Sequence, residues 1–103
     1  MKTAIVTGAG AGIGKAICQK LSQNNYRVGM LDLNEENVNE ASKGVENSFP
    51  LLGDVTNQES IKKAFEKFGE IPDLLVNNVG IVLFGPLEAV SYTHLTLPTI
   101  YSV

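Results

Sequence analysis

Glycine occupies every second position of the segment 8–14, which follows a short apolar run and precedes an amphipathic stretch. In a turn from a strand to a helix, Gly8 permits the tight turn, Gly12 lets the backbone approach a pyrophosphate, and Gly14 lets the helix pack closely on the sheet. The N–H groups and the positive end of the helix then face the phosphates. The segment therefore predicts a site for the pyrophosphate of a dinucleotide.

Two other interpretations of this segment are a turn without a ligand and a P-loop. The context argues against an empty turn, because a strand precedes the glycines, a helix follows them, and an acidic residue ends the second strand. Gly14 and Lys15 resemble the end of a P-loop. A P-loop would also need glycine where Ala9 stands and Ser or Thr where Ala16 stands, so the P-loop interpretation fails twice.

Asp32 closes the second apolar run. At the end of a strand its carboxylate would accept hydrogen bonds from an adenosine ribose, and its charge would repel a 2′-phosphate. NAD is therefore the expected cofactor, and NADP is less favoured. Two alternatives stay open here: Asp32 only begins the turn into the next helix, or Lys15 or Arg27 binds a 2′-phosphate.

Apolar runs and helical periods alternate along the chain, which predicts the order β-α-β-α-β-α-β. Strands joined by helices of this length run parallel and have right-handed crossovers. With the glycine-rich turn, this predicts an α/β fold of the Rossmann type. We expect a doubly wound parallel sheet of order 3-2-1-4, truncated after about four strands. The strands are expected at 3–6, 27–31, 49–52 and 73–76.

Three helices are expected to join these strands. Asn34 can cap the second helix. The third helix begins with a capping box over 56–59 and can end at Gly69. The side chains expected to face the sheet are Ile13, Ala16, Ile17 and Leu21 in the first helix, Val38, Ala41 and Val45 in the second, and Ile61, Ala64, Phe65 and Phe68 in the third.

Composition narrows the class of protein. The chain has 103 residues, of which 44% are apolar and 18% charged, as in one small soluble domain. Its net charge of −3 and the lack of a basic run argue against nucleic acid and a membrane surface as partners. The single cysteine, Cys18, fits a reducing compartment, and no signal peptide or membrane-spanning run is recognisable. A cytoplasmic protein without a metal site is expected.

Three motifs resemble those of the short-chain dehydrogenase/reductase family in its classical form. The segment 7–14 fits the family pattern TGxxxGIG, the segment 53–56 resembles its adenine-contacting segment, and the segment 77–80 resembles its NNAG segment. The resemblance implies that Asp54 binds the adenine amino group, with Val55 beside the ring. The three motifs occur in the family's order within residues 1–88. This stretch is therefore expected to be the N-terminal part of the family's NAD(P)-binding Rossmann domain.

The resemblance also assigns the end of the fourth strand. Asn78 and Gly80 would lie along the nicotinamide ribose, while Asn77 is expected to support the sheet. Val79 replaces the family's usual alanine. The expected cofactor-binding residues are Gly8, Gly10, Gly12, Ile13, Gly14, Asp32, Leu33, Asp54, Val55, Asn78 and Gly80.

The catalytic part of the family pattern has no counterpart in this chain. Family enzymes use a serine and a YxxxK pair, in which lysine lowers the tyrosine pKa so that the phenol exchanges a proton with the substrate oxygen. No lysine follows Lys67. The resemblance therefore implies an intact parent, expected to be a homo-oligomer, that interconverts a small alcohol and carbonyl using NAD, and a chain that retains only cofactor-binding motifs.

Two alternatives to that function belong to other classes of protein. One is a non-catalytic dinucleotide-binding module, which the missing YxxxK also fits. The other is an extended-type sugar-nucleotide epimerase, whose pattern TGxxGxxG requires glycine where Ala11 stands. In family members that prefer NADP a basic residue often occupies this position, so Ala11 also favours NAD.

The segment 90–103 has no helical period and no charged residue apart from His94. It resembles the translation of a transposon-type sequencing-library adapter: GTC TCT TAT ACA CAT CTG ACG CTG CCG ACG encodes residues 90–99 without a mismatch. We therefore expect 90–103 to be a non-native, adapter-derived tail. Ser91, Tyr92 and His94 are given no functional role.

Overall fold

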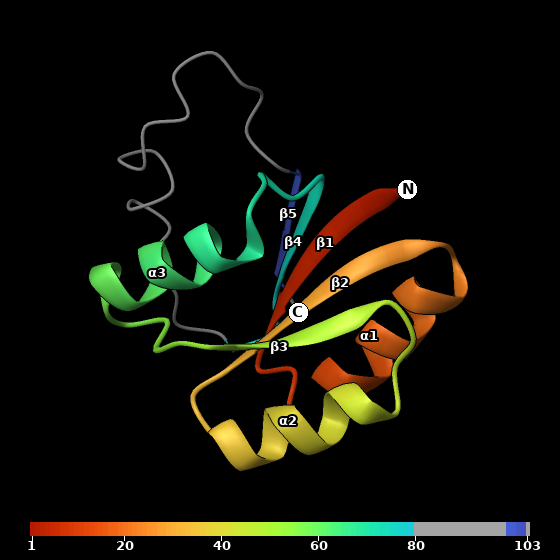
Figure 1. The fold of residues 1–103 in the computed structure, drawn as a ribbon, viewed down its shortest axis with the longest axis horizontal. Coiled ribbons are helices and arrows are strands. Elements are labelled where there is room, and N and C mark those ends of the chain that lie inside the picture. The colour runs from red at the N-terminus through yellow and green to blue at the C-terminus, as the bar shows by residue number, and fades with distance from the viewer. Residues whose placement is uncertain (80–98, 103) are drawn as a thin grey trace.

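A parallel sheet with helices on both faces forms the core of the computed structural model, which describes residues 1–79 and 99–102 (Figure 1). The strand order is β3-β2-β1-β4-β5. The strands are β1 (Lys2–Thr7), β2 (Tyr26–Asp32), β3 (Ser48–Leu52), β4 (Leu74–Asn77) and β5 (Thr99–Ser102). The helices are α1 (Gly12–Gln23), α2 (Glu35–Lys43) and α3 (Gln58–Phe68). Among these, no helix is both long and apolar enough to cross a bilayer.

The predicted order 3-2-1-4 is confirmed, and all four strands run parallel. The sheet continues by one strand beyond that prediction. β5 pairs in parallel with β4, with Thr99 opposite Leu74. This strand lies within the segment 90–103, while residues 80–98, which contain Gly80, Ser91, Tyr92 and His94, lie outside the described residues.

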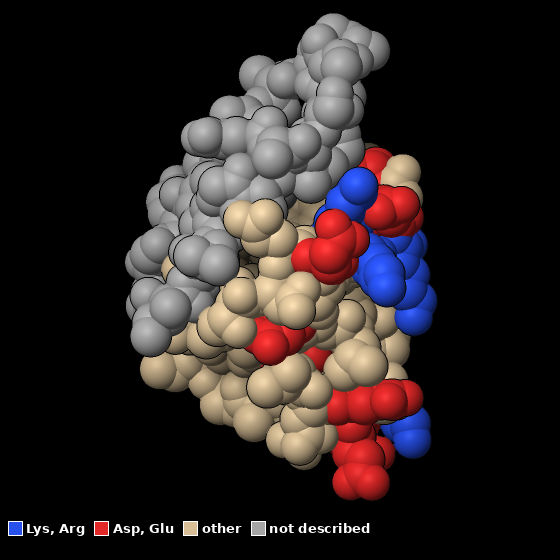
Figure 2. Space-filling model, turned by 90° about the vertical axis from the view of Figure 1, so that its left-hand side faces the viewer, with Lys and Arg blue, Asp and Glu red and all other residues tan. Residues whose placement is uncertain are grey.

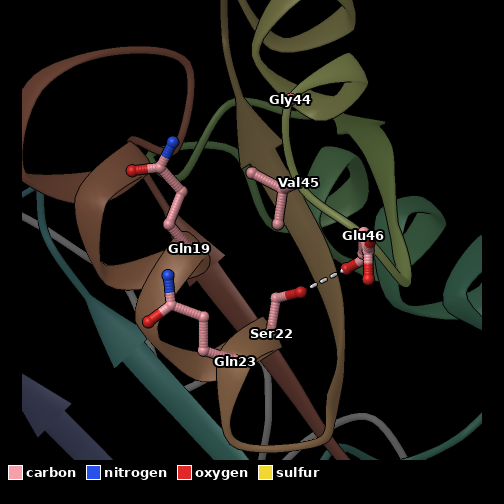
Figure 3. Close-up of a pocket in the computed structure, with 6 residues that line it drawn as sticks. All are labelled: Gln19, Ser22, Gln23, Gly44, Val45 and Glu46. Atoms are coloured by element: carbon pink, nitrogen blue, oxygen red, sulfur yellow. Dashed lines mark hydrogen bonds between the residues drawn. The ribbon is translucent and has the colours of Figure 1, made fainter.

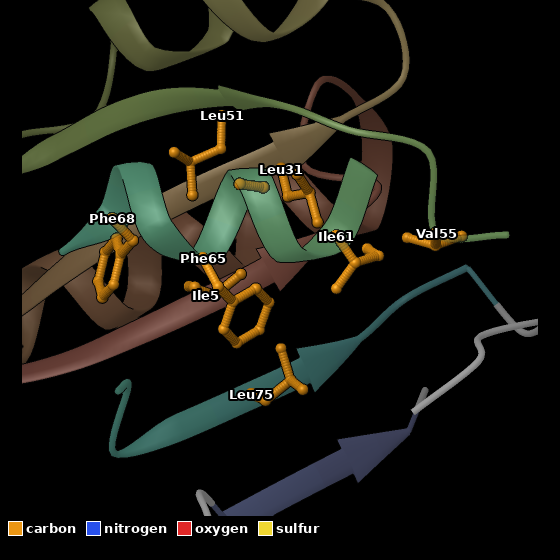
Figure 4. Close-up of a cluster of buried hydrophobic side chains, with 9 residues drawn as sticks. Ile5, Leu31, Leu51, Val55, Ile61, Phe65, Phe68 and Leu75 are labelled. Carbon is orange, nitrogen blue, oxygen red and sulfur yellow. The ribbon is translucent and has the colours of Figure 1, made fainter. Parts of the chain in front are cut away.

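Alternate residues of each strand enter two separate cores. Ile5, Leu31 and Leu75 pack under α3, whereas their neighbours Val6 and Met30 pack under α1 and α2. Successive side chains of a strand point to opposite faces, so a sheet covered on both faces needs continuous apolar runs. Figure 4 shows α3 lying across the sheet with its aromatic side chains directed at the strands.

The buried faces of α2 and α3 are as predicted. Val38 and Ala41 of α2 are buried on one side of the sheet, and Val45 is buried beside them although α2 ends at Lys43, two residues earlier. Asn34 caps α2, and its side chain accepts a hydrogen bond from the N–H of Asn37 at 2.9 Å. Gly69 ends α3 with φ of +90°, a left-handed conformation that favours glycine. The α3 residues buried against the sheet are Ile61, Ala64, Phe65 and Phe68.

The capping box predicted at the start of α3 is wrong. Asn57 is the N-cap, and its side chain accepts from the N–H of Ser60 at 3.0 Å. Thr56 is already engaged, because the Asp54 carboxylate accepts from its N–H at 2.9 Å and from its hydroxyl at 2.6 Å. Competition from a carboxylate two residues earlier therefore moves the start of the helix by one residue.

The predicted inner face of α1 is partly wrong. Cys18 is fully buried, and Ile17 and Leu21 pack at the edge of the core. Ile13, in contrast, is 68% exposed, and Ala16 is also exposed. The physical reason is Gly14: a Cβ there would overlap the carbonyl oxygen of Gly8, so the helix rests on its glycine and turns Ile13 outward.

Candidate functional site

The motif-bearing segments meet at one edge of the sheet. The glycine-rich segment follows β1, Asp32 ends β2, the segment 53–56 follows β3, and the segment 77–79 ends β4. Because the strands are parallel, all their carboxyl ends lie at the same edge, where ligands bind in sheets of this type. The N–H of Gly53 donates to the carbonyl oxygen of Asp32 at 3.0 Å, which brings the second and third segments side by side.

The beginning of α1 is suited to an anion. Gly12 has φ of +60°, and a Cβ built there would have no heavy atom within 4 Å, so the space beside it is open in the described part of the chain. The N-cap Ala11 offers no side-chain acceptor, and no acidic residue lies in the first turn. The N–H groups at the positive end of this helix are thus left for an external acceptor.

The end of β4 fastens the glycine-rich segment to the sheet. The Thr7 hydroxyl accepts from the N–H of Asn78 at 3.0 Å, and the Asn78 side chain donates to the carbonyl oxygen of Gly8 at 3.3 Å. Asn77 is buried, and its side-chain oxygen accepts from the N–H of Val79 at 3.0 Å. Asn77 therefore supports the backbone as predicted, while sequence reasoning assigned no such role to Thr7.

Asp32 contacts both the glycine-rich segment and α2. Its Oδ2 accepts from the N–H of Gly10 at 2.7 Å, and its Oδ1 accepts from the N–H of Asn34 at 3.0 Å. The carboxylate therefore does begin the turn into α2, as one interpretation held. It also lies at the edge of the candidate site.

A cavity of about 220 Å³ lies between the carboxyl ends of β1, β2 and β3. Leu33 and Val79, which are 69% and 43% exposed, offer aliphatic surface to a flat ring. Most of the lining is apolar, and Asp32 and Asp54 contribute two carboxylates to it. It is lined by Gly8, Leu31, Asp32, Leu33, Gly53, Asp54, Val55, Thr56 and Val79.

Sequence reasoning anticipated only part of this lining. It selected Gly8, Asp32, Leu33, Asp54 and Val55, and it placed Gly53 and Thr56 in the adenine-contacting segment without a role of their own. For Leu31 the available signal is position alone, because it directly adjoins Asp32 in the sequence. Gly10, Gly12, Ile13 and Gly14 belong to the glycine-rich segment but do not line this cavity, and Asn78 is connected to it through its hydrogen bond with Gly8.

Ionisation in and near the site follows local contacts. The Thr56 hydroxyl, and then its N–H, hold the pKa of the Asp54 carboxyl below its usual value. Burial raises the pKa of the Cys18 thiol from 9.0 to about 12. Cys18 is therefore a protonated core residue at neutral pH, in agreement with its place in the α1 core.

Charge around this edge is sparse and mainly acidic. Figure 2 looks onto the end of the molecule towards which the strands run, where acidic atoms are set into a mostly uncharged surface and the lysine and arginine side chains gather at one flank. Arg27 stands at the opposite end of β2, five residues or about 16 Å of strand from Asp32. Its guanidinium lies 4.6 Å from the ring centroids of both Phe49 and Phe68. The alternative that Arg27 binds a 2′-phosphate is therefore wrong.

A second, larger cavity of about 350 Å³ lies at the opposite edge, between the end of α1 and the segment after α2 (Figure 3). At this cavity the Ser22 hydroxyl donates a hydrogen bond to the carbonyl oxygen of Glu46 at 2.6 Å, which connects α1 to the segment after α2. Its lining consists of Gln19, Ser22, Gln23, Gly44, Val45 and Glu46, none of which belongs to a motif.

The model of the family described as short chain dehydrogenase matches residues 2–97. The chain belongs to the short chain dehydrogenase family. This match covers the glycine-rich segment, Asp32 and the segments after β3 and β4, and it also runs into the segment 90–103.

Individual relatives agree with the family assignment. An uncharacterized oxidoreductase of Thermotoga maritima is 38% identical over 97 residues, which cover 87% of this chain and 38% of the relative. The NADPH-dependent 3-dehydrocapnine reductase of Ornithobacterium rhinotracheale is 33% identical over 106 residues, which cover 92% and 36%. The chain thus spans little more than a third of the length of these relatives.

A solved structure shows the same arrangement of strands and helices. The crystal structure of a 3-oxoacyl-[acyl-carrier protein] reductase with bound NAD from Brucella melitensis superposes with a TM-score of 0.70 at 32% identity. The superposition covers 78% of this chain and 32% of that protein. Short chain dehydrogenases bind nicotinamide dinucleotides, and parallel sheets of this type bind ligands outside the carboxyl ends of their strands.

Proposed function

We propose that the chain binds NAD at the carboxyl edge of its sheet. The observation that carries this proposal is the juxtaposition of the open N-terminus of α1 with the Asp32-lined cavity. The pyrophosphate would accept from N–H groups of residues 11–14, because these lie at the positive end of α1 and the N-cap Ala11 makes no side-chain hydrogen bond to them. The adenosine would lie in the cavity of about 220 Å³, with its ribose beside Asp32.

The residues of this chain fit the other contacts of such a ligand. Val55, Leu33 and Val79 offer apolar contacts for adenine, and Asp54 lies within reach of a polar group on the ring. Ile13, exposed beside the turn, would cover part of the bound ligand. When bound, the nicotinamide supplies hydride transfer. Asn78 and Gly80 are proposed to lie on the nicotinamide side.

We further propose a preference for NAD over NADP. A 2′-phosphate at the ribose would face the Asp32 carboxylate, and like charges at close range repel. Titration calorimetry on the 103-residue chain should give NAD⁺ an affinity at least about tenfold above that of NADP⁺. Asp32→Ser should narrow this difference, whereas Glu46→Gln, which removes the same charge near the distant cavity, should leave it unchanged. Equal affinities in the unmodified chain would contradict the preference.

For the intact parent we propose the interconversion of a small alcohol and a carbonyl compound with NAD. The proposal rests on family membership and on relatives that are oxidoreductases or reductases. The chain has no lysine after Lys67 and so has no YxxxK pair to exchange the substrate proton. A non-catalytic dinucleotide-binding module is the second candidate, favoured by that same observation.

The source DNA distinguishes these candidates. We propose that native sequence ends near Glu88 and that residues 90–103 are encoded by adapter DNA, because an adapter sequence encodes 90–99 without a mismatch. Recovering the gene beyond the codon for Glu88 should give a different continuation, with a serine and a YxxxK pair further on. A continuation that encodes the segment 90–103 in the genome would contradict the adapter origin, and one without YxxxK would favour the non-catalytic module.

We propose a cytoplasmic location for the parent. The lone Cys18 supports it, because a buried, protonated thiol without a disulfide partner suits a reducing compartment. A homo-oligomeric parent is likewise proposed from the family resemblance alone.

A further inference from the structure

The Asp32 carboxylate connects two segments that are far apart in the sequence. Its hydrogen bond with Gly10 spans 22 residues and, at 2.7 Å, is short for a bond from a backbone N–H. An ionised acceptor makes such a bond roughly twice as strong as a neutral pair. Through its other oxygen, the same carboxylate holds the N–H of Asn34 at 3.0 Å, just before α2.

The rest of the glycine-rich turn has few other anchors near Gly10. Ala9 is fully buried, and its N–H donates to the carbonyl oxygen of Leu31 at 3.1 Å. Among the bonds that the described residues make, the next one along the turn belongs to Lys15, whose N–H donates to Ala11 within the first turn of the helix. The Asp32 contact therefore fixes the turn at the point where it leaves the sheet for the phosphate site.

The hydrogen bond between Asp32 and the N–H of residue 10 requires glycine at that position. A Cβ on Gly10 would lie 2.6 Å from Oδ2 of Asp32 and 2.9 Å from the Cβ of Asn37. Real Cβ atoms do not approach other atoms this closely, and the Asn37 Cβ cannot swing away as a side-chain end can. Only glycine at this position lets the carboxylate reach the backbone N–H.

We infer that Asp32 is a positioning residue that holds the glycine-rich turn in its phosphate-binding shape before any cofactor arrives. A carboxylate has about four acceptor sites, so each oxygen keeps one for a ribose hydroxyl while its backbone bond stays in place. The same side chain would then arrange the pyrophosphate site and receive the ribose. The ribose half of this role rests on the proposed function, whereas the positioning half concerns the free chain.

Amide hydrogen exchange on the free 103-residue chain tests the positioning role. In Asp32→Ala the N–H of Gly10 loses its acceptor, and its exchange should become about tenfold faster or more. Amides of Val28 and Leu75, in the centre of the sheet, should keep their protection. Asp73→Ala is the matched control, because Asp73 is another carboxylate that accepts from a backbone N–H, that of Thr3 at 2.9 Å, but at the opposite edge. It should leave exchange at Gly10 within about twofold of the unmodified chain.

A second variant decides the matter if Asp32→Ala does not fold. Gly10→Ala keeps the carboxylate but separates it from the backbone, so the amide of residue 10 should again exchange about tenfold faster after correction for its intrinsic rate. Unchanged protection of this amide, in whichever variant keeps its central sheet amides protected, would overturn the inference. Failure of NAD⁺ to bind the unmodified chain would overturn the proposed function and leave the exchange result standing.

Discussion

The two carboxylates that line the candidate adenosine cavity differ in how far along the sequence their hydrogen-bond partners lie. Among the described residues, the Asp54 carboxylate accepts only within its own turn, from the N–H and hydroxyl of Thr56. Asp32 accepts from Gly10 and Asn34 and so links the glycine-rich turn to α2. A substitution at Asp54 is therefore expected to act locally. A substitution at Asp32 changes the ligand site and the shape of the turn together.

The ionisation of Asp54 should depend on the Thr56 hydroxyl. That hydroxyl is the main cause of the lowered pKa of Asp54, so Thr56→Val should raise the pKa of Asp54 towards its ordinary value. A carboxyl with a lowered pKa in the folded chain stabilises it above the pKa of the unfolded chain. This stabilisation is lost as the pH falls through the lower pKa of the folded chain.

An NMR titration of the Asp54 carboxyl carbon measures this effect. Thr56→Ser keeps the hydroxyl and serves as the control, so its titration midpoint should match that of the unmodified chain. A midpoint in Thr56→Val that also matches the unmodified chain would show that the hydroxyl does not hold the carboxylate.

At the scale of elements, α1 meets the glycine-rich turn backbone to backbone. Gly14 has no room for a side chain, because a Cβ there would overlap the Gly8 carbonyl oxygen and approach the Asn78 side chain to 2.8 Å. A backbone atom cannot move aside as a side-chain end can. The separation between α1 and the sheet, and with it the position of the helix N-terminus, therefore depends on this glycine.

Gly14→Ala should destabilise the chain by about 1–3 kcal/mol, the usual cost of overpacking. Gly44→Ala is the matched control, since a Cβ there would lie 3.7 Å from the nearest heavy atom, the Ala41 carbonyl oxygen, and φ is −94°. Its free energy of unfolding should stay within about 1 kcal/mol of the unmodified value or rise. Urea unfolding followed by circular dichroism compares the two variants. Equal stabilities would contradict the close packing of α1 on the turn.

The sequence predicted the elements better than their rotation and caps. All four inner residues of α3 were predicted from a helical period, because burial against a sheet imposes that period. The helical period of α1 wrongly predicted that Ile13 is buried, since the orientation of α1 is set by the contact of Gly14 with Gly8 rather than by its apolar stripe.

The candidate site was likewise predicted in its motifs but not in its side-chain contacts. Motif spacing predicted the turn and Asp32, because these depend on the local chain and on the end of a strand. It did not predict that Asp54 would capture Thr56 or that Asp32 would bind the N–H of Gly10. Such contacts depend on side-chain and tertiary geometry, which hydrophobic periods do not encode.

At the scale of the whole molecule, a parallel sheet brings dispersed motifs to one edge. The segments at 7–14, 32–33, 53–56 and 77–79 lie there together, although the sequence spreads them over most of the described chain. The larger cavity beside Ser22 and Val45 lies at the other edge and contains no motif residue. We therefore expect a dinucleotide to bind at the edge that carries the motifs and not at the edge that carries the larger cavity.

An NMR titration of the ¹⁵N-labelled 103-residue chain with NAD⁺ tests the central claim most directly. We predict saturable shifts of the amide signals of Gly10, Gly12 and Asp32, and unchanged amide signals at Ser22 and Val45. Saturable shifts confined to Ser22 and Val45, or no saturable shift while the chain remains folded, would contradict it.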